Sequence, residues 1–483
     1  MSTGIRFVLN GEIVTLDDVE PTRTVLQYLR EDRGLTGTKE GCAEGDCGAC
    51  TAVVVELAGD GERLRYRAIN ACIQFLPTLH GRGLLTVEAL TDAGAPLHPV
   101  QQSMVDCHGS QCGFCTPGFV MSLFALYKSA PRPSRYEVDV ALAGNLCRCT
   151  GYRPIVAAAT AMYDSAGDGP DEAALADSLR SLQPLDAVAA GEGTHSYFAP
   201  VALEHLAQLV EEHPEATLLA GGTDVGLWVT KQYRDLGTVI HVGGVAELQR
   251  IDDGDDGLVV GAAVTLTDAI PAIVAHYPDL EDMFVRFASP PIRNAATLGG
   301  NIANGSPIGD AMPALIALGT RLTLRRGTNT RELLLEDLYL DYQKTVLAPG
   351  EFVERIHIPR PCAGQIVRNY KLSKRFDQDI SAVCAAFSLC LDGDGVGEIR
   401  IAYGGMAATP KRAPQAEAAL SGEPWTEASV RDGMAALAGD YTPLTDMRAS
   451  AAYRRDAAAN LLYRFFLDSS NSGIETDVYR YGR

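Results

Sequence analysis

Apolar residues recur at every second position near the start of the chain, as a half-buried β-strand requires. Ile5, Phe7 and Leu9 follow this pattern, and Asn10-Gly11 comes next as a type I′ turn signal. The pattern predicts a hairpin over residues 4–17, a helix over 22–30, and strands over 51–57, 64–69 and 85–89. A hairpin and a helix among further short strands are typical of a small β-grasp domain.

The apolar period becomes helical from Pro99 onward. Helices are expected over residues 117–128, 136–143 and 152–163, and the first begins with a proline at a position that suits a helix start. This segment is interpreted as an all-α domain. Residues 165–193 are rich in Ala, Asp, Gly and Ser and lack a periodic apolar pattern, so we interpret them as a linker that is partly helical.

Strand patterns return in the second half of the chain. They predict strands over residues 216–219, 382–391 and 398–403, followed by two helices, the last over 452–466. The acidic runs 252–257 and 392–395 lack the glutamate that completes an EF-hand loop, and each lies between strand patterns. Both are therefore predicted to be hairpin turns, and the chain as a whole is predicted to be multidomain α+β.

Nine of the twelve cysteines lie between residues 40 and 151, and eight of these form two sets. The first set has the spacing C-x4-C-x2-C with a fourth cysteine 22 positions on, which is the plant-type [2Fe–2S] pattern. Glycines in this loop permit the positive φ angles and close approach that turn backbone N–H groups toward sulfur. The second set joins a C-x2-C pair to a Cys-x-Cys pair. The sets are Cys42, Cys47, Cys50 and Cys72, and Cys112, Cys115, Cys147 and Cys149.

Two other uses of these cysteines fit the sequence less well. A disulfide framework needs an oxidising compartment, and the N-terminus has no secretory signal. Structural zinc usually takes paired CxxC or CxxH knuckles, which the Cys-x-Cys arm fits poorly. Two [2Fe–2S] clusters are therefore the favoured interpretation. The remaining cysteines have no ligand spacing and are expected to be free thiols: Cys107, Cys362, Cys384 and Cys390.

Two glycine-rich turns lie in the middle of the chain. Ala220-Gly-Gly-Thr-Asp follows the strand expected over 216–219, and Thr297-Leu-Gly-Gly-Asn precedes Asp310. A strand that ends in such a turn exposes consecutive N–H groups that suit a pyrophosphate, and two turns suit an extended dinucleotide. Neither GxGxxG nor GxxxxGK[ST] occurs, so neither a Rossmann fold nor a P-loop is supported.

Composition restricts the partners and the location. The formal net charge of −20 would repel nucleic acid. There is no run of eighteen apolar residues and no export signal, so we expect a cytoplasmic chain without a membrane span.

Motifs along nearly the whole chain resemble one family. They are Glu40-Gly-Cys-x4-Cys-Gly-Ala-Cys, Gln111-Cys-Gly-Phe-Cys-Thr-Pro-Gly, Asn145-Leu-Cys-Arg-Cys-Thr-Gly-Tyr, Leu219-Ala-Gly-Gly-Thr-Asp-Val, Thr297-Leu-Gly-Gly-Asn, Lys371-x2-Lys-Arg-x-Asp-x-Asp-Ile-Ser and Asp446-Met-Arg-Ala-Ser-Ala-Ala-Tyr-Arg. The chain resembles the small iron–sulfur and flavin subunit of bacterial xanthine dehydrogenases, within the molybdenum hydroxylases.

The resemblance implies a domain order. A plant-type [2Fe–2S] ferredoxin-like β-grasp domain would occupy residues 1–90, and an all-α [2Fe–2S]-binding domain would occupy 91–165. A linker over 166–193 would lead to a two-subdomain FAD-binding domain of the vanillyl-alcohol-oxidase (PCMH) type over 194–362. An α+β domain of the carbon monoxide dehydrogenase flavoprotein C-terminal type would complete the chain over 363–483.

The resemblance also implies which residues bind FAD. The first glycine turn would bind the pyrophosphate, Phe287 would pack on a flat ring, and Val353 would offer backbone and packing. The implied FAD residues are Leu218, Leu219, Ala220, Gly221, Gly222, Thr223, Asp224, Val225, Phe287, Thr297, Leu298, Gly299, Gly300, Asn301, Asp310, Val353 and Lys371. Gln111 and Cys149 would face the pterin of a separate large subunit.

The function implied is an electron relay. The large molybdopterin-binding subunit would oxidise hypoxanthine and xanthine to urate, so no catalytic residue for purine oxidation is expected on this chain. Electrons would pass through the two [2Fe–2S] clusters to FAD and then to NAD⁺, in a heterotetramer of two small and two large subunits. In such subunits a charged segment lies beside the flavin and influences access of NAD⁺. The same role is expected here for Lys371, Lys374, Arg375, Asp377 and Asp379.

Three other interpretations remain open at this point. The chain could serve an aldehyde, carbon monoxide or aromatic-acid hydroxylase. It could be a scaffold that is metal-free or binds zinc, which would be colourless. It could be a self-contained flavin oxidase, although the two cysteine sets would then have no role.

Overall fold

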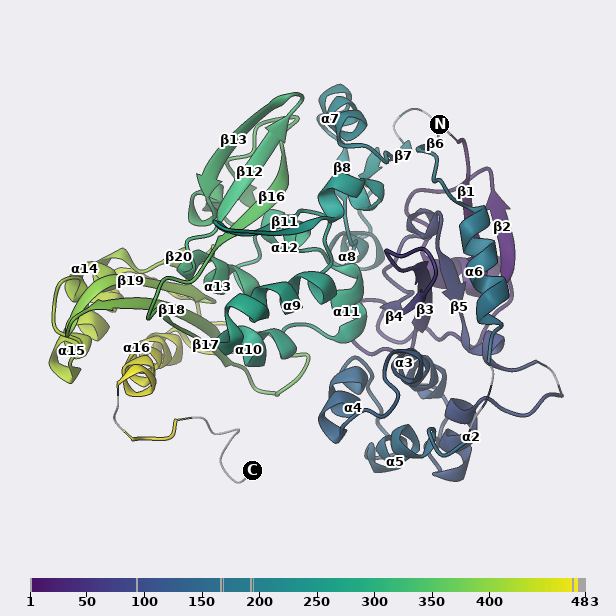
Figure 1. The fold of residues 1–483 in the computed structure, drawn as a ribbon, viewed down its shortest axis with the longest axis horizontal. Coiled ribbons are helices and arrows are strands. Elements are labelled where there is room, and N and C mark those ends of the chain that lie inside the picture. The colour runs from purple at the N-terminus through teal and green to yellow at the C-terminus, as the bar shows by residue number, and fades with distance from the viewer. Residues whose placement is uncertain are drawn as a thin grey trace. The chain divides into compact units, whose positions relative to one another are not determined.

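The computed structural model describes residues 2–92, 94–165, 167, 169–191, 193, 195–470 and 473–476 (Figure 1). The chain divides into two compact units. The first unit comprises residues 1–247, 265–267 and 289–297, and the second comprises 248–264, 268–288 and 298–483. The domain limits expected at residues 1, 166, 194 and 483 lie outside the described residues. No helix in the described part is long and apolar enough to cross a membrane.

The first unit begins with a five-stranded sheet in the order β2-β1-β5-β3-β4. Its strands are β1 (Ile5–Leu9), β2 (Glu12–Leu16), β3 (Thr51–Leu57), β4 (Leu64–Asn70) and β5 (Gly83–Leu85). The turn between β1 and β2 has positive φ at Asn10 and Gly11, as a type I′ turn requires. Thr24 caps α1 (Val25–Gln27) through a capping box, and a π-helical turn (Tyr28–Asp32) continues that helix. These features agree with a β-grasp domain.

One predicted strand is wrong. Residues 85–89 were expected to be extended, but β5 ends at Leu85 and a 3₁₀ turn covers Val87–Leu90. The side chain of Asn10 accepts a hydrogen bond from the Thr86 N–H at 2.9 Å, so this donor is not available to a strand partner. A local apolar pattern cannot reveal this competition, because Asn10 lies 76 positions earlier.

A helical bundle follows in the first unit, with helices α2 (Pro99–Asp106), α3 (Thr116–Ser129), α4 (Arg135–Leu142), α5 (Arg153–Ala161) and α6 (Glu172–Ser181). The apolar side of α3 is buried through Phe119, Leu123 and Phe124. Leu175 and Leu179 of α6 belong to the same hydrophobic cluster. The stretch interpreted as a linker therefore contains a helix whose apolar face is buried.

A four-stranded sheet in the order β6-β7-β9-β8 also belongs to the first unit. Its elements are β6 (Val188–Ala190), β7 (Tyr197–Ala199), α7 (Leu203–Glu212), β8 (Thr217–Leu219), α8 (Val225–Thr230) and β9 (Val239–His241). Strand β9 lies parallel to both β7 and β8. The later segment with α11 (Pro290–Ala295) completes this unit.

The second unit contains a five-stranded sheet in the order β10-β11-β16-β12-β13 and a four-stranded sheet in the order β17-β18-β19-β20. The strands of the first sheet are β10 (Ile251–Gly254), β11 (Gly257–Gly261), β12 (Arg321–Arg326), β13 (Asn329–Leu334) and β16 (Phe352–Pro359). The second sheet has β17 (Ile366–Leu372), β18 (Val383–Asp392), β19 (Gly395–Gly404) and β20 (Lys411–Arg412), and β14 (Tyr339–Asp341) and β15 (Lys344–Thr345) form a separate hairpin. The acidic runs at 252–257 and 392–395 lie at the β10–β11 and β18–β19 turns, as predicted.

Several helices accompany these sheets: α9 (Leu266–His276), α10 (Glu281–Val285), α12 (Leu298–Asn304), α13 (Ala311–Ala317), α14 (Pro414–Leu420), α15 (Glu427–Ala436) and α16 (Ala451–Ser469). Three α-helices follow β19 in the described residues, where two were expected. The core beneath them includes Phe387, whose ring stacks on Phe465 at 4.8 Å between centroids.

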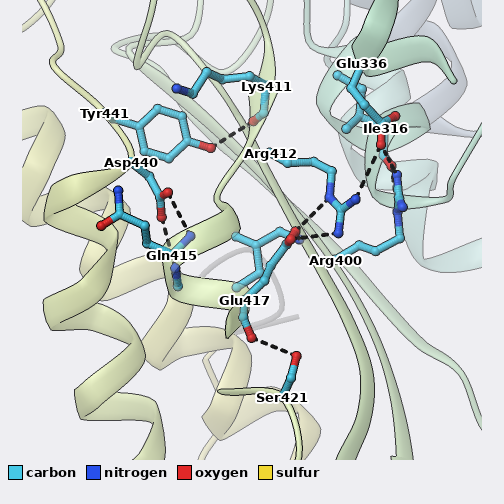
Figure 2. A network of polar contacts seen from close by, with 12 residues as sticks. Ile316, Glu336, Arg400, Lys411, Arg412, Gln415, Glu417, Ser421, Asp440 and Tyr441 are labelled. Atoms are coloured by element: carbon cyan, nitrogen blue, oxygen red, sulfur yellow. Dashed lines mark hydrogen bonds and ion pairs between the residues drawn. The ribbon is translucent and has the colours of Figure 1, made fainter. Parts of the chain in front are cut away.

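A polar network fixes the start of α14 (Figure 2). The Asp440 carboxylate accepts hydrogen bonds from the backbone N–H groups of Gln415 and Ala416 at 2.9 and 3.0 Å. Glu417, in the same helix, accepts from Arg412 at 2.7 Å and from the Ile401 N–H at 2.7 Å. Buried carboxylates are costly unless they are paired in this way, so the network sets where the helix begins.

Two of the cysteines expected to be free are paired. Cys362 and Cys390 form a disulfide within the second unit, which corrects the prediction of free thiols at these positions. They are 28 positions apart, and sequence spacing gave no signal for this pairing. Cys107 and Cys384 are free, and burial raises the pKa of the Cys384 thiol.

Candidate functional site

The first cysteine set lies in the β-grasp domain, on the loop before β3 and just after β4 (Figure 1). Backbone N–H groups of Glu44, Asp46 and Cys47 converge on the Cys42 Sγ at 3.3–3.4 Å. Such donors stabilise negative charge on sulfur and tune the potential of an iron–sulfur cluster. Gly41 leaves room for this arrangement, because a Cβ there would lie 2.7 Å from the Cys47 Sγ.

The four thiols of this set interact with one another. Hydrogen bonding with Cys47 and Cys72 lowers the pKa of Cys42, and hydrogen bonding with Cys72 lowers the pKa of Cys50. Hydrogen bonding with Cys42 raises the pKa of Cys47 and of Cys72. The structure therefore brings together all four residues that the spacing selected.

The second set is assembled from the start of α3 and the loop before α5. Cys112 interacts with Cys149 and raises its pKa, and Cys115 interacts with Cys147. Burial is the first cause, and the interaction with Cys147 the second, of a pKa of about 12 at Cys115. Each pair joins one cysteine from the C-x2-C half to one from the Cys-x-Cys half, so the chain folds back as the spacing required.

Polar groups near Cys147 favour its thiolate. Burial raises the pKa of Cys147, but hydrogen bonds from the Thr150 side chain and N–H outweigh it, and the net pKa is lowered. The backbone N–H of Cys147 donates to the Tyr152 hydroxyl at 3.0 Å. Cys112 and Cys149 are exposed, whereas Cys115 and Cys147 are half-buried.

The donor chemistry of both sets fits [2Fe–2S] clusters. Each set consists of four cysteine thiols, and such a cluster shares four thiolates between two irons. Within the described residues no group of three or more side chains is arranged around the position of a single metal ion. Two sets of four thiols therefore match two such clusters, one set for each cluster.

The first glycine turn follows β8 in the first unit. Gly221 is in close contact with the Ala295 and Ala296 backbone, and a Cβ at Gly221 would collide with the Ala295 carbonyl oxygen. Gly222 has a φ of +72°, a conformation that favours glycine. This turn and its flanks comprise Leu218, Leu219, Ala220, Gly221, Gly222, Thr223, Asp224 and Val225. At Gly221 and Gly222 the backbone is tight and carries no side chain, which suits a pyrophosphate.

Asp224 and Val225 lead from this turn into α8. The Asp224 carboxylate accepts a hydrogen bond from Trp228 Nε1 at 3.1 Å, and burial raises its pKa. Thr297 belongs to the first unit as well and pairs with Thr265 in an isolated β-bridge.

The other predicted FAD residues belong to the second unit. Gly299 touches Ala262, since a Cβ at Gly299 would lie 2.5 Å from the Ala262 carbonyl oxygen. The Asn301 Oδ1 is buried and has no hydrogen-bond partner among the described residues, as expected for an atom that meets a ligand. Val353 is buried in β16 opposite Leu324. Leu298 and Gly300 lie on α12 together with Gly299 and Asn301, and Phe287 follows α10.

Asp310 and Lys371 form a buried ion pair in the second unit. Lys371 Nζ lies 2.5 Å from Asp310 Oδ2, and the two side chains are 3% and 2% exposed. Asp310 Oδ1 accepts a second hydrogen bond from the Ser381 hydroxyl at 2.6 Å. The sequence selected Asp310 and Lys371 separately, and the structure shows that they act on each other.

The charged segment after Lys371 folds on itself. Arg375 donates its backbone N–H to Asp379 at 2.7 Å and its side chain to the Gln378 carbonyl at 2.7 Å. Lys374 Nζ reaches the Met447 carbonyl at 3.1 Å. Both side chains are exposed, and their charges are therefore presented to solvent.

Sequence reasoning missed three residues that support these sites. Arg286 donates to Ser373 and to the Lys371 carbonyl, and its guanidinium lies 4.8 Å from the Phe376 ring centroid. Ser381 is the second partner of Asp310. Asn145 lies between the two cysteine loops. Asn145 and Ser381 stand inside recognised motifs, which was a usable signal, whereas nothing in the sequence distinguished Arg286.

Fold and cysteine geometry together define an iron–sulfur flavoprotein with domains of the molybdenum hydroxylase type. Family models agree: a 2Fe-2S iron–sulfur cluster binding domain matches residues 7–76, and a [2Fe-2S] binding domain matches 86–160. The FAD binding domain in molybdopterin dehydrogenase matches 191–361, and the CO dehydrogenase flavoprotein C-terminal domain matches 368–469.

Sequence similarity to curated proteins supports the same class of protein. The chain is 34% identical to a xanthine dehydrogenase of Emericella nidulans, in a match covering 96% of this chain and 38% of the relative. It is 31% identical to aldehyde oxidase 2 of Cavia porcellus, over 95% of this chain and 39% of the relative. The chain thus spans about two fifths of these relatives. It is homologous to the N-terminal part of xanthine dehydrogenase and belongs to the molybdenum hydroxylase family.

Solved structures share part of the fold. A carbon monoxide dehydrogenase from Hydrogenophaga pseudoflava matches with a TM-score of 0.53 and 28% identity, over 56% of this chain and 94% of that one. Quinoline 2-oxidoreductase from Pseudomonas putida matches with a TM-score of 0.52 over 58% of this chain and 98% of that one, and at 23% identity it supports the fold alone.

Proposed function

We propose that this chain is the electron-transfer component of a xanthine dehydrogenase. It would accept electrons from the molybdenum centre of a separate large subunit and deliver them to NAD⁺. The observation that carries the proposal is the assembly of two four-cysteine sets on a chain that also has a flavin-binding domain. When bound, the clusters supply one-electron carriers and FAD joins one-electron to two-electron chemistry.

The chain's own residues would hold and tune these groups. The N–H groups of Glu44, Asp46 and Cys47 stabilise negative charge at Cys42, and Thr150 does the same at Cys147. The turn at Gly221 and Gly222 would bind the FAD pyrophosphate through its backbone. Thr297, Asn301 and the Asp310–Lys371 pair would bind the rest of FAD.

A partner surface is proposed around the second cysteine set. Cys112 and Cys149 are exposed, and three exposed apolar side chains lie beside them in the chain: Phe114 (47%), Leu146 (36%) and Tyr152 (39%). Exposed apolar groups around exposed metal ligands favour a protein interface over open solvent. Gln111, the neighbour of Cys112, would face the pterin in a heterotetramer of two small and two large subunits.

The second part of the proposal is that the substrate of the complex is a purine. Identity to xanthine dehydrogenases over nearly the whole chain supports hypoxanthine and xanthine. The match to an aldehyde oxidase supports an alternative in which the same relay serves another molybdenum hydroxylase.

An anaerobic visible spectrum of the purified full chain tests the relay. We expect the absorbance of flavin and iron–sulfur clusters, and we expect it to bleach when NADH is added. Colour that does not change with NADH would refute the NAD⁺ assignment and leave the cluster and flavin assignments standing. A colourless protein would refute both.

Co-expression of this chain with the large subunit tests which substrate supplies the electrons. Reduction of the chain by xanthine but not by an aldehyde supports the purine assignment, and the reverse result selects the aldehyde alternative.

A Lys374→Ala, Arg375→Ala double variant should change NAD⁺ kinetics and leave reduction by the purine unchanged, since both side chains lie in the exposed charged segment.

A further inference from the structure

We propose that Asn145 is a positioning residue that clamps the two cysteine loops together and sets the coupling between them. Its side chain holds the loop of the first set against the segment that carries Cys147. One electron would then pass between the ligand sets across a backbone hydrogen bond that this clamp keeps short. The inference rests on the proposed function, because it concerns transfer between the two clusters.

The connection itself is a single hydrogen bond. The backbone N–H of Leu146 donates to the carbonyl oxygen of Cys47 at 3.0 Å. Cys47 belongs to the first set, and Leu146 immediately precedes Cys147 of the second set. The path from one thiol to the other therefore follows covalent bonds except at this one step.

The Asn145 side chain forms three hydrogen bonds next to the bond between Leu146 and Cys47. Its Nδ2 donates to the Gly48 carbonyl at 3.0 Å and to the Thr51 hydroxyl at 3.2 Å. Its Oδ1 accepts from the Ser122 hydroxyl at 2.6 Å. The side chain thus links the first cysteine loop, the start of β3 and helix α3.

The clamp is buried, and its amide group is hydrogen-bonded. Asn145 is 2% exposed, and both Nδ2 hydrogens have acceptors. A buried amide that loses such partners costs free energy, so the loops are held in one arrangement. An amide does not titrate in the physiological range, and the clamp is therefore independent of pH.

Two glycines let the backbones approach this closely. Gly48 has a φ of +68°, and a Cβ there would lie 2.5 Å from Asn145 Nδ2. Gly118 is in α3, and a Cβ there would collide with the Gly48 carbonyl oxygen and lie 3.2 Å from the Ala49 Cα. Both positions require the absence of a side chain for the two loops to touch.

The proposed step moves one electron and no proton. The second cysteine set would hold the cluster that supplies the electron, and the first cysteine set would hold the cluster that accepts it. No covalent bond forms or breaks. Asn145 touches neither cluster ligand sulfur in this scheme and acts only by fixing the distance between the loops.

The test is electron paramagnetic resonance of the full chain, reduced partly and then fully with dithionite. Magnetic interaction between two reduced clusters falls steeply with distance, so it reports the separation of the loops independently of turnover. In the wild type we expect the fully reduced spectrum to differ from the sum of two isolated cluster signals. We expect this difference to be lost in Asn145→Ala, with both clusters still present by spin count.

Gly118→Ala provides a second route to the same result. It keeps Asn145 and a helix-compatible residue but drives a methyl group against Gly48. It decides the question if Asn145→Ala fails to retain both clusters. Asn294→Ala is the matched control, because Asn294 Nδ2 donates to the Ala68 carbonyl of the same domain at 2.8 Å but does not lie between the cysteine loops.

The outcomes are distinct. An unchanged interaction in Asn145→Ala and Gly118→Ala, with both clusters present, would overturn the clamp. So would a wild-type spectrum that equals the sum of two isolated clusters, or a loss in Asn294→Ala as large as in Asn145→Ala. A wild type without any [2Fe–2S] signal would instead refute the proposed function.

Discussion

Replacing Lys371 by methionine should destabilise the second unit strongly. The substitution removes the ammonium group that lies 2.5 Å from Asp310 and leaves that carboxylate, 2% exposed, with Ser381 as its remaining neutral donor. Breaking a buried ion pair by removing one partner costs about 3–5 kcal/mol. Because each 1.4 kcal/mol is about tenfold, the folding equilibrium should fall roughly a hundred- to several-thousand-fold.

Tryptophan fluorescence can assign the loss to the correct unit. The chain has two tryptophans, Trp228 in the first unit and Trp425 in the second. A Trp228→Phe background leaves Trp425 as reporter, and Trp425 contacts Phe465 in the core of the second unit. Urea unfolding of this background, with and without Lys371→Met, measures the change in the free energy of unfolding.

A double-mutant cycle completes the assay. Adding Asp310→Asn to Lys371→Met removes the unpaired charge and should recover most of the loss. A cost below about 1 kcal/mol for Lys371→Met, in the range of an exposed pair, would refute the reasoning that this pair is desolvated. A double variant no more stable than Lys371→Met would refute it as well.

Three further predictions concern other parts of the chain. Gly221→Ala should abolish flavin binding while iron content stays unchanged, because its Cβ collides with the Ala295 carbonyl; Gly59→Ala, where a Cβ meets nothing within 4 Å, should retain flavin. Burial, with a smaller effect of Lys128, lowers the pKa of His98 to about 4, whereas the unfolded value is near 6.5. The neutral ring therefore contributes stability that is fully present above about pH 6.5. This stability is lost as the pH falls toward 4. Unfolding between these pH values should depend less on pH in His98→Asn, and identical slopes would contradict this. Arg454→Lys should cost about 1–3 kcal/mol by urea unfolding. Nη1 of Arg454 donates to the Ala382 and Gly405 carbonyls and Nη2 donates to Asp446, and the single nitrogen of lysine cannot occupy both positions. An unchanged urea midpoint would show that the two-nitrogen geometry of arginine is dispensable.

Local patterns accounted for the features whose causes are local. The hairpin turn at Asn10-Gly11 and the first cysteine loop are defined by residues within a few positions of one another, and the structure agrees with both. The motif from Asp446 to Arg454 now has a physical basis, because the two end residues form an ion pair at 2.7 Å.

Features that depend on distant partners were not visible in the sequence. Asn145 donates to Gly48 from 97 positions away, and Lys371 reaches Asp310 across 61 positions. The segment interpreted as a linker has Leu175 and Leu179 buried against a core formed earlier in the chain. In each case the decisive energy is the burial or pairing of groups that only the tertiary fold brings together.

The late return of the chain to the first unit affects the order of folding. The carbonyl of Ala68, in β4 of the iron–sulfur domain, accepts its 2.8 Å hydrogen bond from Asn294, which is 226 positions further on. At synthesis rates of about 5–20 residues per second, that donor leaves the ribosome roughly 10–45 s after its acceptor. The Ala68 carbonyl of the domain that carries the first cysteine set therefore lacks this donor until much of the flavin domain has been synthesised.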